Sequence, residues 1–303
     1  MRLNGLDLNL LIALHAVLTE RNISRAAERV FLSQPAMSNA LARLREHLGD
    51  DLVVRAGRQL MLTPRAEALV EPVRDILMRI ESAVAAPPQF DAATATRSFS
   101  LLVSDYTTTV LVQPLLQRLA RTAPGVRFAL LSQVAGDNIA RLESGEIDLL
   151  IVPEQYRSER HPSLRLFDES YVCVTCADNA AVRERLSFDD YLAAGHVVTQ
   201  FGDGRIPAFD SWLMERFGVI RRIEVTVASL TAPAEMVVGT QRIATVHRRL
   251  AERAAARLAL KVWPPPLEIP ALVEYVQWNR VRGDDAAIGW LVSELKRTAA
   301  ALE

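Results

Sequence analysis

Apolar residues recur at three- and four-residue steps in the first part of the chain, which is the spacing of helices with one buried face. The first run covers residues 10–18, follows Asp7 as a candidate cap, and should end near residue 21. Ser24 is the expected cap of a short second helix. Its Ala26 and Ala27 leave room for another helix to approach closely. The pattern therefore predicts two packed helices before residue 31.

The next helix has an exposed side of a different kind. Ser33 is a good N-cap, Pro35 suits the first turn, and apolar residues mark one face as far as residue 48. The residues left facing outward are Gln34, Ser38, Asn39 and Arg43. A helix-turn-helix places the start of its second helix in the DNA major groove, where such side chains can bond base edges. An ordinary surface helix with solvated polar side chains is the alternative.

A hairpin is predicted over residues 50–62, with its turn at Ala56 and Gly57. Arg55 and Arg58 stand at the tip, where guanidinium groups suit phosphates or a narrow minor groove. This hairpin has the form of a wing beside the helices.

A long helix is predicted to begin at Thr63 and Pro64, with apolar residues at helical steps as far as residue 84. We interpret it as a dimerisation arm, and an ordinary packed helix is the alternative. The sequence AAPP at residues 85–88 then indicates a break between domains.

Composition adds limits on the class of protein. A chain of 303 residues with half of them apolar can form two or three packed units. Residues 1–62 carry eight Arg and six Asp or Glu, a net charge of +2, so the remainder carries −3 of the total of −1. Apolar runs stay shorter than the roughly 20 residues that span a bilayer, so a cytoplasmic protein is expected.

Strands and helices alternate beyond residue 97, which favours parallel sheets that bind ligands at the carboxyl ends of their strands. Helices are predicted between the strands, and a last helix over residues 285–300. The predicted strands are residues 99–103, 126–131, 147–152, 171–174, 196–199 and 273–278.

The first of these strands ends in SDYTTT at residues 104–109. Hydroxyl groups and a helix N-terminus converge there, as a cradle for a carboxylate or phenolate would require. Helix capping by Ser104 or Asp105 explains one of these residues but not all of them. Arg205 either pairs with a ligand carboxylate or covers its loop in solvent.

Catalytic and metal-binding patterns are missing from the sequence. The five histidines are scattered, and H-E-x-x-H, G-x-S-x-G and P-loop motifs do not occur. Cys173 and Cys176 lie three apart in an apolar strand and so point to opposite faces, which favours core packing over a redox or metal pair. We expect no enzyme activity and no cofactor.

The element order, the SQPAMS segment at residues 33–38, the wing and the T-P-x-A start of the long helix resemble the LysR-type transcriptional regulators across the whole chain. The segments GLDLNLL, VCVTC and GHV resemble the NodD-like and NahR-like subgroup, which responds to aromatic compounds. NahR-like members that bind small aromatic acids have a histidine at the position of Ser170 in this chain. This difference argues against a salicylate-like effector.

The resemblance implies a mixed fold with a winged helix-turn-helix at 1–62, a dimerising linker helix at 63–86 and a hinge at 87–96. It implies an α/β effector domain at 97–303, like a periplasmic binding protein. Its first subdomain is expected at about 97–170 and 276–303, and its second at about 171–275. The implied partners are double-stranded promoter DNA, a small aromatic effector, a second copy in a dimer or tetramer, and RNA polymerase, with no membrane.

The resemblance also assigns residues to two sites. The DNA-binding set is Ser33, Gln34, Pro35, Ser38, Asn39, Arg43, Arg55 and Arg58. The effector-binding set is Ser104, Thr107, Thr108, Ser170, Phe201, Gly202, Arg205 and Gln277. The alternative is a cytoplasmic small-molecule binding protein whose N-terminal module contacts protein. Base-reading residues beside wing arginines argue against it.

Overall fold

The structure is a computed structural model that describes residues 2–3, 6–56, 59–85, 90–133, 136–201, 212, 215–218 and 220–302. The chain divides into two compact units, residues 1–87 and 88–303. The division falls at the AAPP segment, where the sequence predicts a domain break.

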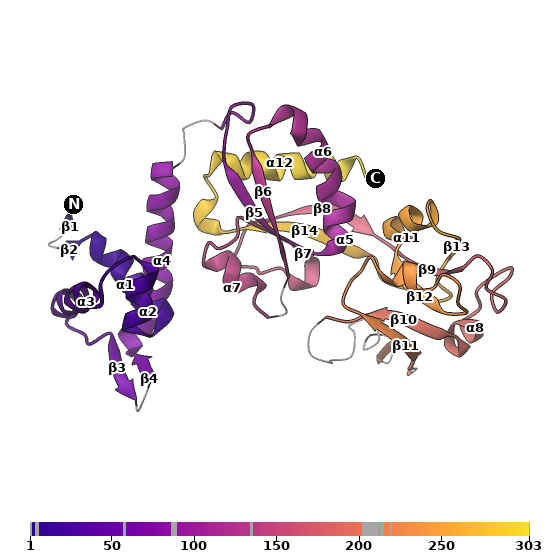
Figure 1. Ribbon diagram of the computed structural model, residues 1–303, viewed down its shortest axis with the longest axis horizontal. Helices are drawn as coiled ribbons and strands as arrows, with labels where there is room; N and C mark the ends of the chain where they lie inside the picture. Colours follow the sequence, from indigo (N-terminus) through magenta and orange to yellow (C-terminus); the bar gives the residue numbers. More distant parts are fainter. Residues whose placement is uncertain are drawn as a thin grey trace. The chain divides into compact units, whose positions relative to one another are not determined.

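The first unit is a group of helices followed by a hairpin and a long helix (Figure 1). A short antiparallel pair precedes the first helix, and strands β3 and β4 pair in the register Val53 to Leu62. The elements are β1 (Arg2–Leu3), β2 (Leu6–Asp7), α1 (Asn9–Glu20), α2 (Ile23–Arg29), α3 (Gln34–Leu48), β3 (Val53–Ala56), β4 (Gln59–Leu62) and α4 (Pro64–Ala85).

The helix caps differ in part from expectation. Asn22, not Ser24, caps α2, because its backbone is extended and its Oδ1 accepts the Arg25 N–H at 3.1 Å. Leu8 occupies the cap position of α1, while Asp7 Oδ1 accepts the Asn9 N–H at 3.1 Å. Ser33 caps α3 as predicted, with its hydroxyl accepting the Ala36 N–H at 3.3 Å.

One core holds the first unit together. Leu14 and Val17 of α1 pack with Ala26 of α2 and with Met37 and Leu44 of α3, and all five are buried. Each large apolar side chain buried in this way contributes roughly 2 kcal/mol to stability. The packing fixes which side of α3 faces outward.

The second unit contains two five-stranded sheets. The first has the order β6-β5-β7-β14-β8, with β5 parallel to β6 and β7 and with β14 antiparallel to β7 and β8. Its strands are β5 (Ser98–Val103), β6 (Arg127–Ser132), β7 (Leu149–Pro153), β8 (Ser163–Glu169) and β14 (Leu272–Trp278).

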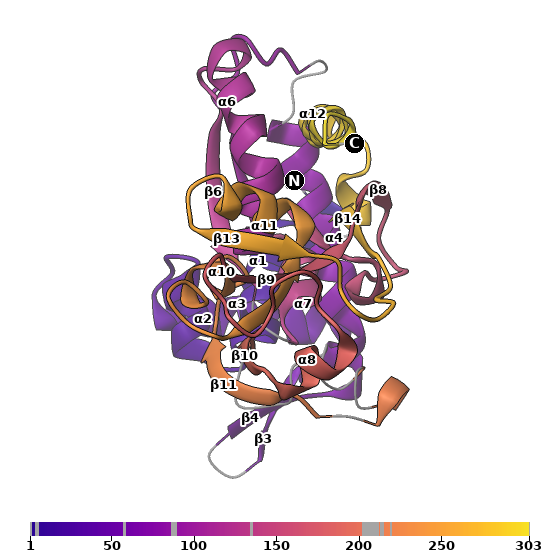
Figure 2. The ribbon, with the colours of Figure 1, turned by 90° about the vertical axis from the view of Figure 1, so that its right-hand side faces the viewer.

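Helices cover both faces of this sheet. Leu101 of β5 packs with residues of α6 and α12, while its neighbour Leu102 packs with Leu142 of α7 on the opposite face. Figure 2 views α12 nearly end-on above the sheets. The helical segments are α5 (Asp105–Thr107), a π-helical turn (Thr108–Val112), α6 (Gln113–Thr122), α7 (Asn138–Glu143), two 3-10 turns (Glu154–Tyr156 and Arg280–Arg282) and α12 (Ala286–Ala300).

The second sheet has the order β11-β10-β12-β9-β13, with β10 parallel to β11 and β12. Cys173 and Cys176 of β9 are both buried and free, as core packing predicts. The elements are β9 (Tyr171–Cys176), α8 (Phe188–Ala193), β10 (Gly195–Thr199), β11 (Arg222–Val227), α10 (Pro233–Met236), β12 (Ile243–His247), α11 (Arg248–Ala255) and β13 (Leu260–Trp263).

The chain crosses between the two sheets twice. The first crossing is at Ser170, between β8 and β9, as expected. The second lies between Trp263 and Leu272, because all of β14 pairs with β7 and β8. The expected boundary near residue 276 was therefore too late: apolar strand residues from either sheet look alike in sequence.

Candidate functional site

The outward side of α3 carries the polar residues singled out in the sequence. Gln34, Pro35, Ser38, Asn39 and Arg43 are exposed. Pro35, Asn39 and Arg43 are four residues apart, and Gln34 and Ser38 have the same spacing, so they form one stripe along the helix. The opposite side is anchored by the buried residues Met37, Leu41 and Leu44. The structure thus brings the predicted residues of α3 together on one accessible face.

Arg43 is the only one of these side chains for which an ion pair is seen among the described residues. Its Nη2 lies 3.5 Å from Oδ2 of Asp7, and both groups are partly exposed. The backbone hydrogen bond from Asn9 and, to a smaller extent, Arg43 hold the pKa of Asp7 below its usual range. An exposed pair of this kind is weak and can be exchanged for a phosphate.

A network of polar contacts joins α3 to the wing. Arg45 donates from Nε to the Asp51 carbonyl at 2.7 Å and from Nη2 to the Val53 carbonyl at 3.1 Å. Asp50 Oδ1 accepts the Thr63 hydroxyl at 2.6 Å and the Leu52 N–H at 2.7 Å. These contacts tie the wing to the end of α3 and to the start of α4. The sequence shows no sign of these contacts, because Arg45 and Asp50 look like ordinary charged surface residues.

Arg55 lies on β3 opposite Leu60 and is exposed. Arg58, the other predicted wing residue, lies outside the described residues.

The long helix α4 buries one side and exposes apolar residues on another. Val73 and Met78 are buried, whereas Ile76 and Ile80 are exposed. Their spacing of four residues places the two isoleucines on one face. The described part of α4 therefore carries an unpartnered apolar strip.

The hydroxyl residues after β5 are used largely within their own turn. Ser104 caps α5 by accepting the Thr107 N–H at 3.0 Å, and its hydroxyl lies 2.9 Å from that of Thr107. Thr107 is buried, while Thr108 is half-buried and begins the π-helical turn. A π-helical turn widens the backbone and is often found at functional sites.

In the described part of the chain, Asp105 joins the two subdomains through several hydrogen bonds to one carboxylate oxygen. Its Oδ2 accepts the Ser229 hydroxyl at 2.7 Å, the Leu230 N–H at 2.9 Å, and the Thr231 N–H and hydroxyl at 3.1 and 3.0 Å. Burial acts to raise the pKa of Asp105, but the hydrogen bonds from Ser229 and Thr231 outweigh it and hold the pKa below its usual range. The carboxylate of the first subdomain thus latches a turn of the second.

A buried ionisable cluster lies where the crossing strands meet. Glu169 accepts the Tyr106 hydroxyl at 2.6 Å and the Ser170 N–H at 2.8 Å, and its Oε2 lies 3.2 Å from Nη1 of Arg249. Glu274 is equally buried, and its Oε2 has no hydrogen-bond partner among the described residues. Burial and the charge of Glu169 raise the pKa of Glu274 to about 8.

A histidine completes the cluster from the second subdomain. The ring of His247 stacks on Tyr106 at 4.2 Å between centroids and lies 5.0 Å from the ring of Tyr171. Burial lowers the pKa of His247 to about 4, so the ring is neutral at pH 7.

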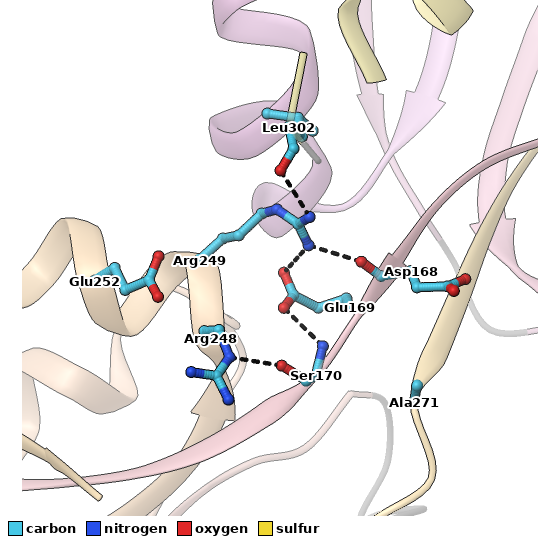
Figure 3. Close-up of a pocket in the computed structure, with 8 residues that line it drawn as sticks. All are labelled: Asp168, Glu169, Ser170, Arg248, Arg249, Glu252, Ala271 and Leu302. Carbon is cyan, nitrogen blue, oxygen red and sulfur yellow. Dashed lines mark hydrogen bonds and ion pairs between the residues drawn. The ribbon is translucent and has the colours of Figure 1, made fainter. Parts of the chain in front are cut away.

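Ser170 lies at the first crossing, beside a pocket of about 320 Å³ (Figure 3). Its hydroxyl accepts Nε of Arg248 at 2.8 Å. Arg249 also lines the pocket, and it donates to the carbonyls of Asp168 and Leu302, at 2.7 and 3.0 Å. Charged residues of both signs therefore surround Ser170.

The remaining predicted effector residues fall into three situations. Phe201 is exposed, and Gly202 and Arg205 lie outside the described residues. Gln277 is fully buried and holds the loop after the first 3-10 turn: its Oε1 accepts the Ser158 N–H at 2.9 Å and its Nε2 donates to the Ser158 carbonyl at 2.7 Å. Both ends of the amide are thus occupied by the backbone of Ser158, so Gln277 holds this loop within the first subdomain.

Two contacts that matter here carried little signal in the sequence. Asp105 was recognised only as a cap, because its partners lie more than a hundred residues away in SLT at 229–231. Glu274 stands inside an apolar strand, and an acidic residue at such a position is the one clue that could have found it. Glu169 ends the mixed strand SLRLFDE and gave no such clue. Among the described residues, no helix is long and apolar enough to cross a membrane, and no metal-binding group of His, Cys, Asp or Glu occurs.

A winged helix-turn-helix joined to two α/β subdomains defines a DNA-binding regulator with an effector domain. Comparison of sequences gives the same class. Residues 8–67 match the bacterial regulatory helix-turn-helix protein of the lysR family, and residues 92–300 match the LysR substrate binding domain. The chain belongs to the LysR family of transcriptional regulators.

Known proteins resemble the chain over its whole length. Nodulation protein D 1 of Bradyrhizobium sp. (strain NC92) is 41% identical over 291 residues, which cover 96% of this chain and 92% of that protein. Nodulation protein D 1 of Rhizobium tropici is 41% identical over 302 residues, which cover 100% and 98%. The structure of a probable transcriptional regulator from Pseudomonas aeruginosa has a TM-score of 0.66, 30% identity and 97% coverage of both chains. The structure of CbnR with its target DNA shares the fold, with a TM-score of 0.52, 18% identity, and coverage of 97% and 100%.

Proposed function

We propose that this regulator reads promoter DNA with the exposed stripe of α3 and that a small aromatic or phenolic effector, bound between the subdomains of the second unit, switches the binding or bending of that DNA. The protein would act in the cytoplasm. The observation that carries the proposal is the accessible row of uncharged hydrogen-bonding side chains at the start of α3.

The side chains of that row match the chemistry of base edges. Gln34 and Asn39 can each form paired bonds to adenine, and Ser38 can donate or accept. The N-cap residue Ser33 and the start of α3 suit a phosphate, Pro35 fixes the first turn, and Arg43, Arg55 and Arg58 suit the backbone or the minor groove.

The effector would bind between the subdomains, beside the contact of Asp105 with Ser229 and Thr231. Ser104 and Thr108 stand beside Asp105, and Phe201 is exposed for contact with an aromatic ring. Gly202 and Arg205, which follow Phe201 in the sequence, complete the proposed effector set. Thr107 would hold the Ser104 hydroxyl in place through their hydrogen bonds. Ser170 would change its contacts when the subdomains move, because it lies where the chain crosses between them. A ligand switches the protein only if it binds one arrangement of the subdomains more tightly than another.

The exposed isoleucines of α4 support a dimer through that helix. Ile76 and Ile80 form an apolar strip of the kind that a second copy of the helix covers. Pairing of such dimers would give the tetramer, and contact with RNA polymerase would follow at the promoter.

The first experiment is a nuclease footprint on the DNA upstream of the protein's own gene, with and without a panel of phenolic and aromatic-acid compounds. We expect a protected region whose length or hypersensitive sites change with one compound. Ser38→Glu should remove the protection, because the added carboxylate is repelled by the negatively charged phosphates of the DNA. Ser293→Glu, at an exposed position of α12, is the matched control and should protect as the wild type does.

Absence of protection by the wild-type protein at any salt concentration would favour the alternative, a small-molecule binding protein whose N-terminal unit contacts protein. Thr108→Val tests the effector site separately. It should keep the footprint and weaken the response to the active compound. An unchanged response would remove Thr108 from the site.

A further inference from the structure

Phe31 is the most exposed large apolar side chain in the described part of the chain. It lies in the turn between α2 and α3, and 97% of its surface is accessible. The neighbouring Leu32 is also exposed. An aromatic ring gains nothing from the fold when it stands in solvent, so its position needs another explanation.

The backbone of Phe31 adds to this anomaly. Its φ of 55° lies in the left-handed region, which a bulky side chain rarely adopts because it strains the backbone. Hydrogen bonds around it, from the Phe31 N–H to the Glu28 carbonyl at 3.2 Å and from the Leu32 N–H to the Ala27 carbonyl at 2.9 Å, hold the turn in that shape. Leu52 also has a positive φ of 61°, but it is fully buried and its packing offsets the strain. Phe31 has no such packing against the described part of the chain.

The position of Phe31, directly before α3, indicates which partner its ring could contact. Residues 31–36 are all exposed, so the ring is continuous with Ser33, Gln34 and Pro35 at the start of the reading helix. When a helix enters the major groove by its N-terminal end, the turn before it lies against the wall of the groove. That wall consists of deoxyribose rings and phosphates, and thymine methyl groups stand beside it.

We propose that Phe31 is a DNA-contacting residue whose ring packs on deoxyribose and thymine methyl carbons next to the reading helix. The inference rests on the proposed DNA-reading role of α3. A second copy of the chain is a poorer occupant, because Phe31 and Leu32 offer far less surface than the roughly 800 Å² per partner of a stable interface. The contact is apolar, so it adds affinity without releasing a counterion.

The test uses the full-length protein, a fluorescent duplex of about 30 base pairs of arbitrary sequence, and the fragment upstream of its own gene. Phe31→Asn removes the ring and places a residue that tolerates the left-handed region. Phe31→Tyr keeps the ring. Ile220→Asn is the matched control, because Ile220 is exposed in the second unit, away from α3 in sequence.

We expect Phe31→Asn to weaken binding to both duplexes on the order of tenfold, the effect of losing most of one apolar contact. Its melting temperature should equal or exceed that of the wild type, and the dependence of its affinity on salt should be unchanged. Phe31→Tyr should bind within about twofold of the wild type, as should Ile220→Asn.

Equal affinity of Phe31→Asn and wild type for both duplexes would overturn the inference while leaving the DNA-reading role of α3 intact. A Phe31→Asn protein that sediments as a smaller species without DNA would also overturn it, because the ring would then lie between copies. Failure of the wild type to bind either duplex would instead reject the proposed role of α3.

Discussion

Replacement of Glu274 by glutamine is expected to stabilise the protein at neutral and alkaline pH and to have little effect below about pH 4.5. Glu274 is only 2% exposed, lies beside Glu169, and has an Oε2 without a hydrogen-bond partner among the described residues. The fold therefore holds its carboxyl group in the neutral form, which a glutamine amide imitates without a charge to bury.

The sign and size follow from the pKa of Glu274, which is about 8 in the folded protein against 4.5 for an exposed glutamate. A raised acid pKa means that the folded state retains a proton that the unfolded state has lost. Stability is thus fully present below about pH 4.5 and falls as pH rises towards 8. One proton corresponds to about 1.4 kcal/mol for each pH unit, so the wild type should lose roughly 2 to 3 kcal/mol between pH 5 and pH 7 from this group.

The assay is urea unfolding of wild type and Glu274→Gln at several pH values, followed by circular dichroism. The difference in the free energy of unfolding should grow with pH in favour of the variant. Glu169→Gln is the control of opposite sign: it weakens the acceptor of the Tyr106 hydroxyl and the partner of Arg249, and should destabilise by a few kcal/mol at neutral pH. A difference between Glu274→Gln and wild type that does not change from pH 5 to pH 8 would refute the reasoning.

Three further predictions concern the latch, the wing and the dimer. Asp105→Asn should loosen the contact between subdomains, which would be seen as faster hydrogen exchange at residues 229–231. In the wild type the same loosening should appear only as the pH falls through the lowered pKa of Asp105, because the carboxylate must first be protonated. Arg45→Met should reduce DNA affinity at least fivefold and lower the melting temperature by a few degrees, because it removes two hydrogen bonds that hold the wing to α3. Equal affinity would contradict this. Ile76→Asp combined with Ile80→Asp should give a monomer in sedimentation, and an unchanged assembly would place the interface elsewhere.

Features that depend on nearby residues were predictable from the sequence. The start and the two faces of α3 followed from the cap Ser33, from Pro35, and from the spacing of Met37, Leu41 and Leu44. Caps and helical periodicity act within a few turns, so a local sequence reveals them. The same local reasoning failed between Asn22 and Ser24, where two good caps compete two residues apart. Backbone geometry, which the sequence does not reveal, decided for Asn22.

Features that depend on distant residues were not predictable. Gln277 resembles any polar residue near the end of a strand, and its role appears only when the loop at Ser158 is folded against it. The boundary of β14 depends on which sheet offers the better partner strand, a choice between two apolar edges. Both features depend on pairing across more than a hundred residues, which the pattern of a single sequence does not reveal.

The latch and the buried cluster act on the same short segment of the chain. Asp105 and Tyr106 are neighbours in α5, yet Asp105 is held by the turn at Ser229 and Thr231 while Tyr106 is held by Glu169 at the crossing strands. The cluster also reaches the second subdomain through His247, which stacks on Tyr106. A rotation of one subdomain against the other that releases Asp105 must therefore also disturb the packing around Tyr106. Because both contacts lie on one short segment, they join the two subdomains at adjacent residues, which is a physical link of the kind that a two-state response to a ligand uses.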